Sequence, residues 1–374
     1  RIGLDEFEPG STMKPFLVAS AMEEKVVGPH TIYFCENGDW SFQGHVFRDT
    51  HDYAWLPVTR IIRYSSNIGA AKIGLELGSK RYYRCLRQLG LGQKTGLPLP
   101  AESDGVLRPP KWNPVDLVSA SFGQGFSLTA LQLTQAYLCL ANKGVKIPLK
   151  LVKQPRQSRF EPQRVFSEAT ATRVLRMLQD VVQEDGTGTQ ARIPGLKVGG
   201  KTGTAQKASP EGGYAEKYVA SFIGLFPSVD PEYLVVAVVD EPKKSHYGGV
   251  VAAPAVRKVG LELLTYADEF QGLQLQQASN ARAPSRAAKP DPSGYSLVRT
   301  DLQTELASLS SGSGVPDLRG LPLRRALELL ARKGIMPQVK GSGVVVDGQS
   351  PEPGAQWRND GQWVIRLSEA PKQR

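Results

Sequence analysis

Apolar residues recur at helical spacing through the first half of the chain. A largely apolar run at 16–22 follows a Pro-Gly turn and predicts an opening helix. Thr129, with Gln132 three residues later, is typical of a capping box at a helix start. The three- and four-residue spacing predicts further helices at 57–64, 68–77, 83–90, 129–143 and 168–184.

The hydrophobic period changes to two after residue 195. This alternation predicts three strands, at 196–205, 218–226 and 233–239. A closing helix is predicted at 253–268, whereas 27–55 and 95–127 are rich in turn formers and are expected to be irregular. Helices followed by antiparallel strands, with a helix against them, indicate the α+β class.

Composition changes abruptly at residue 272. Gln, Ala, Ser, Pro and Gly dominate 272–313, so this segment is expected to be a flexible linker. It separates a predicted domain at 1–271 from a small predicted domain at 314–369. In the small domain a helix is predicted to begin at Pro322, followed by strands at 335–340, 343–346 and 362–367.

Charge and cysteine content narrow the function classes. The net charge is +10 and the pI is near 9.4, which favours anionic surroundings. The basic residues are scattered and do not alternate with aromatics, so no nucleic acid partner is expected. The three cysteines lie far apart and the four histidines form no cluster with ligand spacing, so neither a disulfide framework, a metal site nor a cofactor is predicted. The sequence contains no run of about 18 apolar residues, so no membrane span is predicted within it.

A hydroxyl and an amine stand three residues apart near the start of the opening helix, at Ser11 and Lys14. Residues i and i+3 share one helix face with Cβ atoms about 5–6 Å apart, so a hydrogen bond between these two side chains is expected. Unpaired N–H groups and the positive end of the helix dipole favour an anion beside Ser11. In isolation, the pair would indicate only a helix cap followed by a solvated lysine.

Two more short motifs follow this pair. In chain order the three motifs are Ser11-x-x-Lys14, Ser65-x-Asn67 and Lys201-Thr202-Gly203. Together they are characteristic of penicillin-binding proteins and class A β-lactamases, which attack amides with a serine. A second Lys-Thr-Gly at 94–96 lies in a Gly- and Pro-rich segment, whereas Lys201 lies in a predicted strand that could bind an extended peptide at its edge. The site is therefore assigned to Lys201.

The attacking hydroxyl needs a base. Lys14 accepts the Ser11 proton only when neutral, yet a free lysine has a pKa of about 10.4. Burial and the second cation of Lys201 are expected to lower this pKa by about three units, which corresponds to about 4 kcal/mol. Lys201, with the Thr202 and Thr204 hydroxyls, is expected to bind a substrate carboxylate.

The remaining polar groups of the motifs also have predicted roles. Ser65 is expected to relay a proton to the leaving amine, and Asn67 to hold either Lys14 or the substrate amide. Backbone N–H groups of Ser11 and Thr204 are predicted to form the oxyanion hole. The predicted substrate-binding residues are Ser66, Thr202, Gly203 and Thr204.

Four stretches carry a family resemblance: Glu8-Pro9-Gly10-Ser11-Thr12-Met13-Lys14-Pro15, Ser65-Ser66-Asn67, Gly123-Gln124-Gly125 and Lys201-Thr202-Gly203-Thr204-Ala205. They resemble the transpeptidase domain of a class B, monofunctional penicillin-binding protein of the division-associated, septal type. The likeness covers about residues 1–270 and implies the fold that these proteins share with serine β-lactamases. Residues 314–369, with Val315-Pro316-Asp317, are similar to a PASTA domain. Met13 departs from the Val or Phe of many relatives but is apolar and of suitable size.

The resemblance implies a peptidoglycan D,D-transpeptidase. Ser11 would attack the penultimate D-Ala of a stem peptide, release the terminal D-Ala and pass the acyl group to an amine of a neighbouring strand. β-Lactams would acylate Ser11 as substrate mimics. The implied partners are a SEDS-type glycosyltransferase and division-complex membrane proteins. The implied location is extracytoplasmic, with a membrane helix ahead of this chain as the anchor.

Three alternatives would use the same residues differently. A class A β-lactam-hydrolysing enzyme carries a Glu-x-x-Leu-Asn loop, which does not occur between residues 68 and 200. A β-lactam sensor would share the motifs, and the sequence leaves that function open. A wall-binding protein with an inert catalytic half is disfavoured, because every polar group that the mechanism needs is present. We therefore expect penicillin to label Ser11, and the labelling to persist without residues 314–369.

Overall fold

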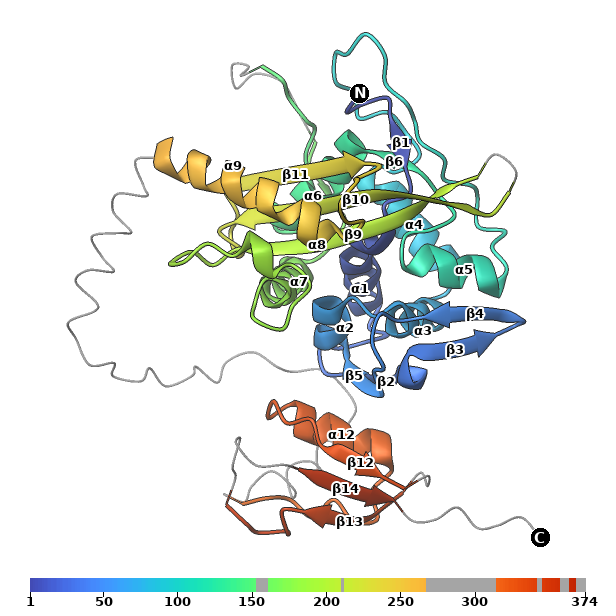
Figure 1. The fold of residues 1–374 in the computed structure, drawn as a ribbon, viewed down its shortest axis with the longest axis vertical. Helices are drawn as coiled ribbons and strands as arrows, with labels where there is room; N and C mark the ends of the chain where they lie inside the picture. The colour runs from blue at the N-terminus through green and yellow to red at the C-terminus, as the bar shows by residue number, and fades with distance from the viewer. Residues whose placement is uncertain (153–160, 210–211, 267–313, 342–344, 357–362, 368–374) are drawn as a thin grey trace, which may run out of the picture. The chain divides into compact units, whose positions relative to one another are not determined.

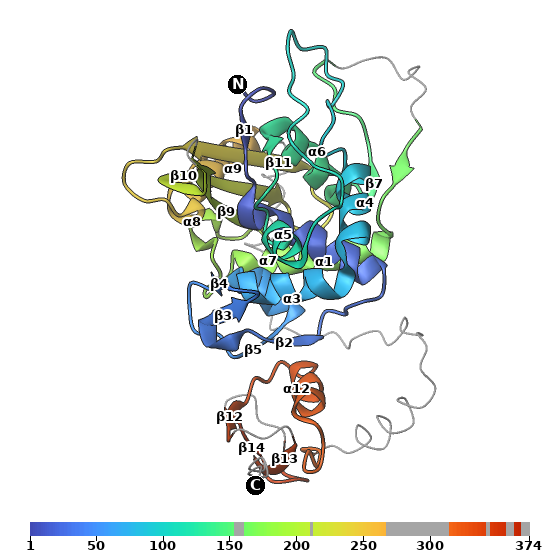
Figure 2. The same cartoon turned by 90° about the vertical axis from the view of Figure 1, so that its right-hand side faces the viewer.

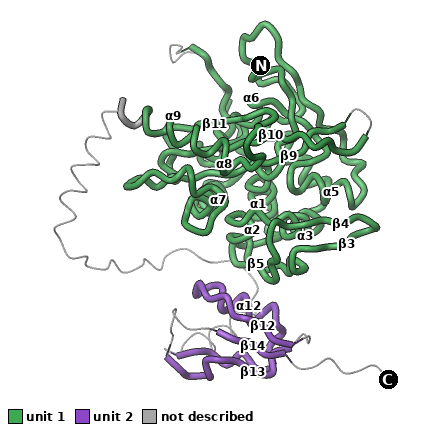
Figure 3. The backbone as a smooth tube through the Cα atoms, in the orientation of Figure 1, with its two compact units in different colours: residues 1–278 green, residues 279–374 purple. Residues whose placement is uncertain are grey.

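The computed structural model describes residues 1–152, 161–209, 212–266, 314–341, 345–356 and 363–367. The chain divides into two compact units, Arg1–Ala278 and Ser279–Arg374 (Figure 3). The predicted linker at 272–313 lies outside the described residues, so the predicted domain boundaries stay predictions. Helices and antiparallel strands both occur in the large unit, as the α+β prediction requires.

The large unit alternates helices with mostly short strands along the chain (Figure 1). Its α-helices are α1 (Lys14–Glu23), α2 (Val58–Tyr64), α3 (Asn67–Leu77), α4 (Ser79–Leu89), α5 (Pro114–Ser121), α6 (Ala130–Ala141), α7 (Glu168–Val181), α8 (Gly248–Val251) and α9 (Ala253–Tyr266). Its strands are β1 (Glu6–Phe7), β2 (Ile32–Phe34), β3 (Asp39–Phe42), β4 (His45–Arg48), β5 (Trp55–Pro57), β6 (Leu128–Thr129), β7 (Val145–Lys146), β8 (Gln163–Arg164), β9 (Gly199–Ala208), β10 (Tyr214–Phe226) and β11 (Tyr233–Asp240). Short 3-10 helices lie at η1 (Gly10–Met13), η2 (Glu36–Gly38) and η3 (Thr189–Ala191).

The large unit contains a three-stranded antiparallel sheet of order β11–β10–β9. In both views β11 lies between α9 and α6, and it contacts both helices (Figures 1 and 2). Successive residues of β10 point to opposite faces. Phe222 and Phe226 pack with Val256 of α9, whereas Ile223 and Leu225 join the core of the helical part. Because β10 is covered on both faces, its sequence is apolar without interruption toward its end.

Strand β9 is an edge of this sheet, and η1 packs against it. The close approach depends on Gly203. A Cβ built at this position would lie 2.2 Å from Ser221 Oγ and 2.7 Å from Thr12 Cγ2. The glycine of the Lys-Thr-Gly motif thus lets the turn that carries Ser11 lie directly on the edge strand.

Helix α1 is the centre of the helical part. Every residue from Lys14 to Met22 is buried, which explains why the sequence is apolar at most positions of this helix rather than along one stripe. The Phe16 and Tyr137 rings meet edge to face, with 4.9 Å between their centroids. Helices α3, α4 and α7 also contact α1. A lysine on this helix is therefore forced into a water-poor environment.

Most predicted elements are confirmed, with ends shifted by a few residues. The predicted capping box is present at the start of α6, where Thr129 and Gln132 each accept from the other's backbone N–H. Two predictions of irregular structure are wrong. Segment 27–55 contains the pair β2–β5 and the hairpin β3–β4, in which Trp40 lies opposite Phe47. Segment 95–127 contains α5, which begins at the cap residue Asn113.

The small unit combines α12 (Leu323–Ala331) with β12 (Gln338–Lys340), β13 (Val346–Ser350) and β14 (Val364–Leu367), in the sheet order β12–β14–β13. The strand predicted at 343–346 lies later in the chain, as β13, and 342–344 are outside the described residues. The buried Gln349 amide joins separate segments: its Oε1 accepts from Leu318 N (2.6 Å), and its Nε2 donates to Pro316 O and Pro351 O (both 3.0 Å).

Candidate active site

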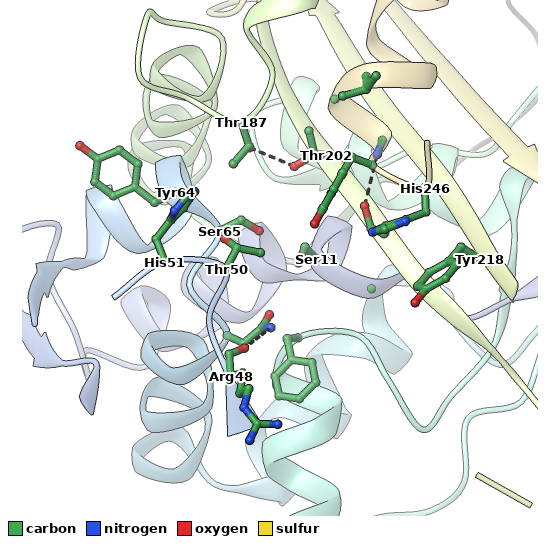
Figure 4. Close-up of a pocket in the computed structure, with 18 of the residues that line it drawn as sticks. Ser11, Arg48, Thr50, His51, Tyr64, Ser65, Thr187, Thr202, Tyr218 and His246 are labelled. Carbon is green, nitrogen blue, oxygen red and sulfur yellow. Dashed lines mark hydrogen bonds between the residues drawn. The ribbon is translucent and has the colours of Figure 1, made fainter. Parts of the chain in front are cut away.

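A cleft of about 740 Å³ lies between the edge strand β9 and the helical part (Figure 4). Ser11 stands near its centre, with Ser65 and Thr50 on one side and Thr202 on the other (Figure 4). Ser11 comes from η1, Ser65 from the α2–α3 junction and Thr202 from β9, whereas Thr50 belongs to the loop between β4 and β5. The cleft therefore gathers all three predicted motifs.

The turn that carries Ser11 is held by backbone contacts. Gly10 has φ +56° and donates its N–H to Gly123 O at 2.9 Å. Tyr137 Oη donates to Thr12 O at 2.7 Å from the buried side. Ser11 lies in the 3-10 turn η1, one turn before the α-helix proper, so the predicted position at the start of α1 is shifted by a few residues.

The Lys14 amine is fully buried and meets the Ser65 motif. Its Nζ donates to Ser65 O at 2.5 Å, to Ser65 Oγ at 3.2 Å and to Asn67 Oδ1 at 2.8 Å. The predicted hydrogen bond to Ser11 is not among its contacts. The acceptors of this amine come instead from the α2–α3 junction.

The Lys201 amine reaches the same hydroxyl from the sheet. Its Nζ donates to Ser65 Oγ at 2.9 Å and to Thr202 O and Oγ1 at 3.2 and 3.3 Å. Lys201 is fully buried, as Lys14 is. One hydroxyl oxygen thus joins two buried amines that are 187 positions apart along the chain, as their numbers 14 and 201 show.

Burial changes the basicity of both amines. Burial lowers the pKa of Lys14 from 10.5 to about 7, and the Asp49 carboxylate opposes this shift. Burial, and after it the charge of Lys14, lower the pKa of Lys201 well below its ordinary value. The prediction of a neutral Lys14 is supported, but burial rather than the second cation is its cause. Repulsion between the amines disfavours a state in which both are protonated.

Asp49 organises the Ser65 motif, and sequence reasoning missed it. Its Oδ1 accepts from Asn67 N (2.5 Å) and Ile68 N (3.1 Å), the first N–H groups of α3. Its Oδ2 accepts from Ser66 Oγ (2.5 Å), which itself accepts from Gly69 N (2.9 Å). Ser66 is fully buried, so the structure corrects its predicted substrate-binding role: Ser66 caps α3. Asp49 lies in the segment expected to be irregular, where nothing in the sequence links it to a helix start.

The β9 side of the cleft carries three threonines. Thr202 and Thr204 line it as predicted, and Thr204 Oγ1 accepts from Gly248 N at 3.2 Å. Thr187, from the loop after α7, was not predicted and lies 3.0 Å from Thr202 Oγ1. Gly203 is absent from the lining of this cleft, so its part is to bring η1 and β9 together. Lys94, in the second Lys-Thr-Gly, is exposed in a loop.

An aromatic wall of Tyr218, His246 and Tyr247 closes one end of the cleft. The Tyr218 and His246 rings stack with 4.4 Å between centroids, and those of His246 and Tyr247 are 4.2 Å apart. Arg48 and His51 line the other end (Figure 4). Among the described lining residues none is Asp or Glu. Within the described part of the chain, no group of three His, Cys, Asp or Glu side chains is placed to hold a metal ion.

Comparison with protein families agrees with this geometry. The family described as "Penicillin binding protein transpeptidase domain" matches residues 4–260, and the PASTA domain family matches residues 314–368. The chain therefore belongs to the penicillin-binding protein transpeptidase family. It combines this domain with a PASTA domain.

Curated proteins similar in sequence to this chain are named as transpeptidases. The "Probable peptidoglycan D,D-transpeptidase PenA" of Neisseria gonorrhoeae is 38% identical over 261 residues, covering 68% of this chain and 44% of that protein. The "Peptidoglycan D,D-transpeptidase FtsI" of Escherichia coli K12 is 33% identical over 252 residues, covering 67% of this chain and 42% of that protein. The chain thus spans less than half the length of these curated relatives.

Solved structures show the same fold. The transpeptidase domain of Burkholderia pseudomallei penicillin-binding protein 3 matches with a TM-score of 0.66 and 35% identity, over 74% of this chain and 81% of that domain. Penicillin-binding protein 3 of Mycobacterium tuberculosis, solved with aztreonam, matches with a TM-score of 0.64 and 32% identity, over 71% of this chain and 63% of that one. The fold predicted from the resemblance is confirmed.

Proposed function

We propose that the chain is the catalytic part of a peptidoglycan D,D-transpeptidase that acts through an acyl-enzyme on Ser11. The observation that carries this proposal is the Ser65 hydroxyl, which receives hydrogen bonds from two buried amines next to Ser11. One amine, Lys14, has a pKa of about 7, so a large fraction is neutral at physiological pH. A buried lysine that is largely neutral suits the activation of a serine.

In the acylation step Ser11 Oγ bonds to the carbonyl carbon of the penultimate D-Ala. Its proton passes to the neutral Lys14 amine, and the carbonyl oxygen becomes an oxyanion. N–H groups at the first turn of η1 lack partners within the helix, so the N–H of Ser11, with that of Thr204 on the edge strand, suits this oxyanion. When the amide C–N bond breaks, Ser65 Oγ gives its proton to the leaving D-Ala nitrogen and regains one from Lys14 or Lys201.

The acyl group then leaves Ser11 through the same proton transfers in reverse order. An amine of a neighbouring stem peptide attacks the ester carbonyl and gives up a proton to the Lys14 and Ser65 pair, and Ser11 Oγ recovers its hydrogen. Rapid hydrolysis instead would need a base aimed at a water beside the ester. No described residue lining the cleft offers a carboxylate for that purpose. This favours transfer to an amine over β-lactam hydrolysis.

The test is covalent labelling with a fluorescent penicillin followed by peptide mass spectrometry. We expect one adduct, on Ser11, that Ser11→Ala abolishes and Ser41→Ala, a change on the exposed face of β3, leaves intact. The chain also contains its own matched control for the third motif. Lys201→Ala is expected to reduce labelling strongly, whereas Lys94→Ala, in the exposed Lys-Thr-Gly, has no effect. An adduct elsewhere, or equal effects of the two lysine changes, would contradict the proposal.

The finer assignments follow from the likeness to FtsI and PenA. We infer a role in septal wall synthesis at the outer face of the cytoplasmic membrane, with a SEDS-type glycosyltransferase and division-complex membrane proteins as partners. No helix among the described residues is long and apolar enough to cross a membrane, so the predicted anchor stays a prediction. The small unit is expected to be dispensable for acylation, because every residue of the cleft comes from the large unit. Labelling of a chain that ends near residue 271 tests this.

A further inference from the structure

The segment that leads into the catalytic turn η1 runs antiparallel to a second segment of chain. At its start β1 pairs with β6. At its end the Gly10 N–H donates to Gly123 O at 2.9 Å. Between these two contacts the first segment has only residues 8 and 9, whereas the second has residues 124–127. The second segment therefore bulges outward as it passes Glu8.

The Glu8 side chain bridges this bulge. Its Oε1 accepts from the Gly125 N–H at 2.9 Å, and the Tyr214 hydroxyl donates to the same oxygen at 3.4 Å. Its Oε2 is enclosed and has no hydrogen-bond partner among the described residues. Burial raises the pKa of Glu8, and the Gly125 N–H opposes this shift. A carboxylate is unfavourable in such a place unless it is hydrogen-bonded, so the bond to the bulging loop is what stabilises it.

The bridged loop, residues 123–125, reaches the reacting groups in two ways. Gly123 O accepts from the N–H of Gly10, the residue directly before Ser11. Gln124 lines the cleft itself. The two glycines of the loop have φ values of +83° and +79°, and glycine is conformationally permissive. The loop therefore depends on contacts from outside to keep one conformation, and the Glu8 carboxylate supplies one of them.

We propose that Glu8 is a positioning residue for acylation: its carboxylate holds the 123–125 loop against η1 and so fixes the direction of the Ser11 hydroxyl and N–H. The inference rests on the proposed function, because it concerns the acylation of the same serine. Glu8 is not among the residues that line the cleft, so it acts through the loop and not on the substrate. A misplacement of about 1 Å in an active site costs about a hundredfold in rate, so a small movement of the loop is enough to slow acylation.

Stopped-flow measurements with a fluorescent penicillin at several concentrations separate the Kd of the first complex from the acylation rate constant. The matched control is Asp5→Ala, which removes an exposed carboxylate that pairs with Arg1. We expect Glu8→Ala to lower the acylation rate constant about tenfold or more, while Kd changes less than about threefold. Glu8→Asp is too short to reach the Gly125 N–H and should be equally slow. Glu8→Gln keeps an acceptor oxygen at the same reach and should restore the rate constant to within about threefold.

Three results would overturn the inference: wild-type acylation by Glu8→Ala, a Glu8→Gln variant as slow as Glu8→Ala, or a loss that lies in Kd alone. Hydrogen exchange of the Gly125 amide is a second measurement, and it should be faster in Glu8→Ala and Glu8→Asp than in Glu8→Gln. If neither Glu8→Ala nor Glu8→Asp folds while Glu8→Gln does, Glu8 has a purely structural role and the inference is wrong. A wild type that is not acylated on Ser11 contradicts the proposed function instead, so the two failures are distinguishable.

Discussion

The protonation state of Lys14 predicts how acylation depends on pH. Burial lowers its pKa from 10.5 to about 7, which corresponds to about 5 kcal/mol. Only the neutral amine accepts the Ser11 proton, so the acylation rate should rise with pH through about 7 and then level off. At pH 5 about 1% of the amine is neutral, which predicts a rate about a hundredfold below the plateau.

The same shift predicts an effect on stability. In the unfolded chain Lys14 has its ordinary pKa, so between about pH 7 and 10.5 the unfolded state binds more protons than the folded state. Below about pH 7 the buried Lys14 charge lowers the free energy of unfolding by its full amount. This loss becomes smaller as the pH rises from about 7 to 10.5. Lys14→Met removes the penalty. The free energy of unfolding of the wild type should rise between pH 6 and 9 by about 3 kcal/mol more than that of the variant.

Stopped-flow acylation with a fluorescent penicillin from pH 5 to 9, together with denaturant unfolding at both ends, measures these quantities. His51 and His246 also line the cleft, so a double variant, His51→Gln with His246→Gln, is the control and should keep the acid limb. A rate that does not change between pH 6 and 8, or an acid limb that disappears with the histidines, would refute the assignment of Lys14 as the base.

Three further changes test the surroundings of the site. Asp49→Asn removes the charge that raises the Lys14 pKa, so the acid limb of the rate profile should move to lower pH; a move to higher pH would contradict this electrostatic account. Gly123→Ala places a Cβ 2.0 Å from Gly10 O and should slow acylation at least about tenfold, whereas Gly125→Ala, with open space at its Cβ, should cost far less. Gln349→Leu leaves buried hydrogen-bond partners unsatisfied and should destabilise the small unit by about 2–4 kcal/mol. Hydrogen exchange in α12 should become faster, while acylation should be unchanged. The control is Gln338→Leu, at an exposed position of β12.

Local pattern was sufficient where an element is long or its end is chemically marked. The helical period identified α3, α6 and α7, and alternation identified the sheet, because burial imposes these periods on any sequence that folds this way. Hairpin β3–β4 escaped prediction because each strand has only four residues and its aromatic pairs are visible only across the turn. Helix α5 escaped because it lies at the end of the Gly- and Pro-rich segment 95–127, although Asn113 and Asp116 form a capping box at its start.

The motifs predicted the reacting groups because each role demands a particular chemistry. A hydroxyl is needed to attack, an amine to take the proton, and an amide to hold that amine in place. The motifs alone predicted Ser11, Lys14, Ser65, Asn67 and Lys201 as site residues, and the strand pattern set Lys201 apart from the second Lys-Thr-Gly. Asp49 and Thr187 depended on tertiary structure, since aspartate and threonine are common and only folding brings them to a helix start or a cleft wall. Folding also accounts for the lowered pKa of Lys14. Its pKa depends on how much water the surrounding helices exclude, and no arrangement of neighbours along the chain specifies that.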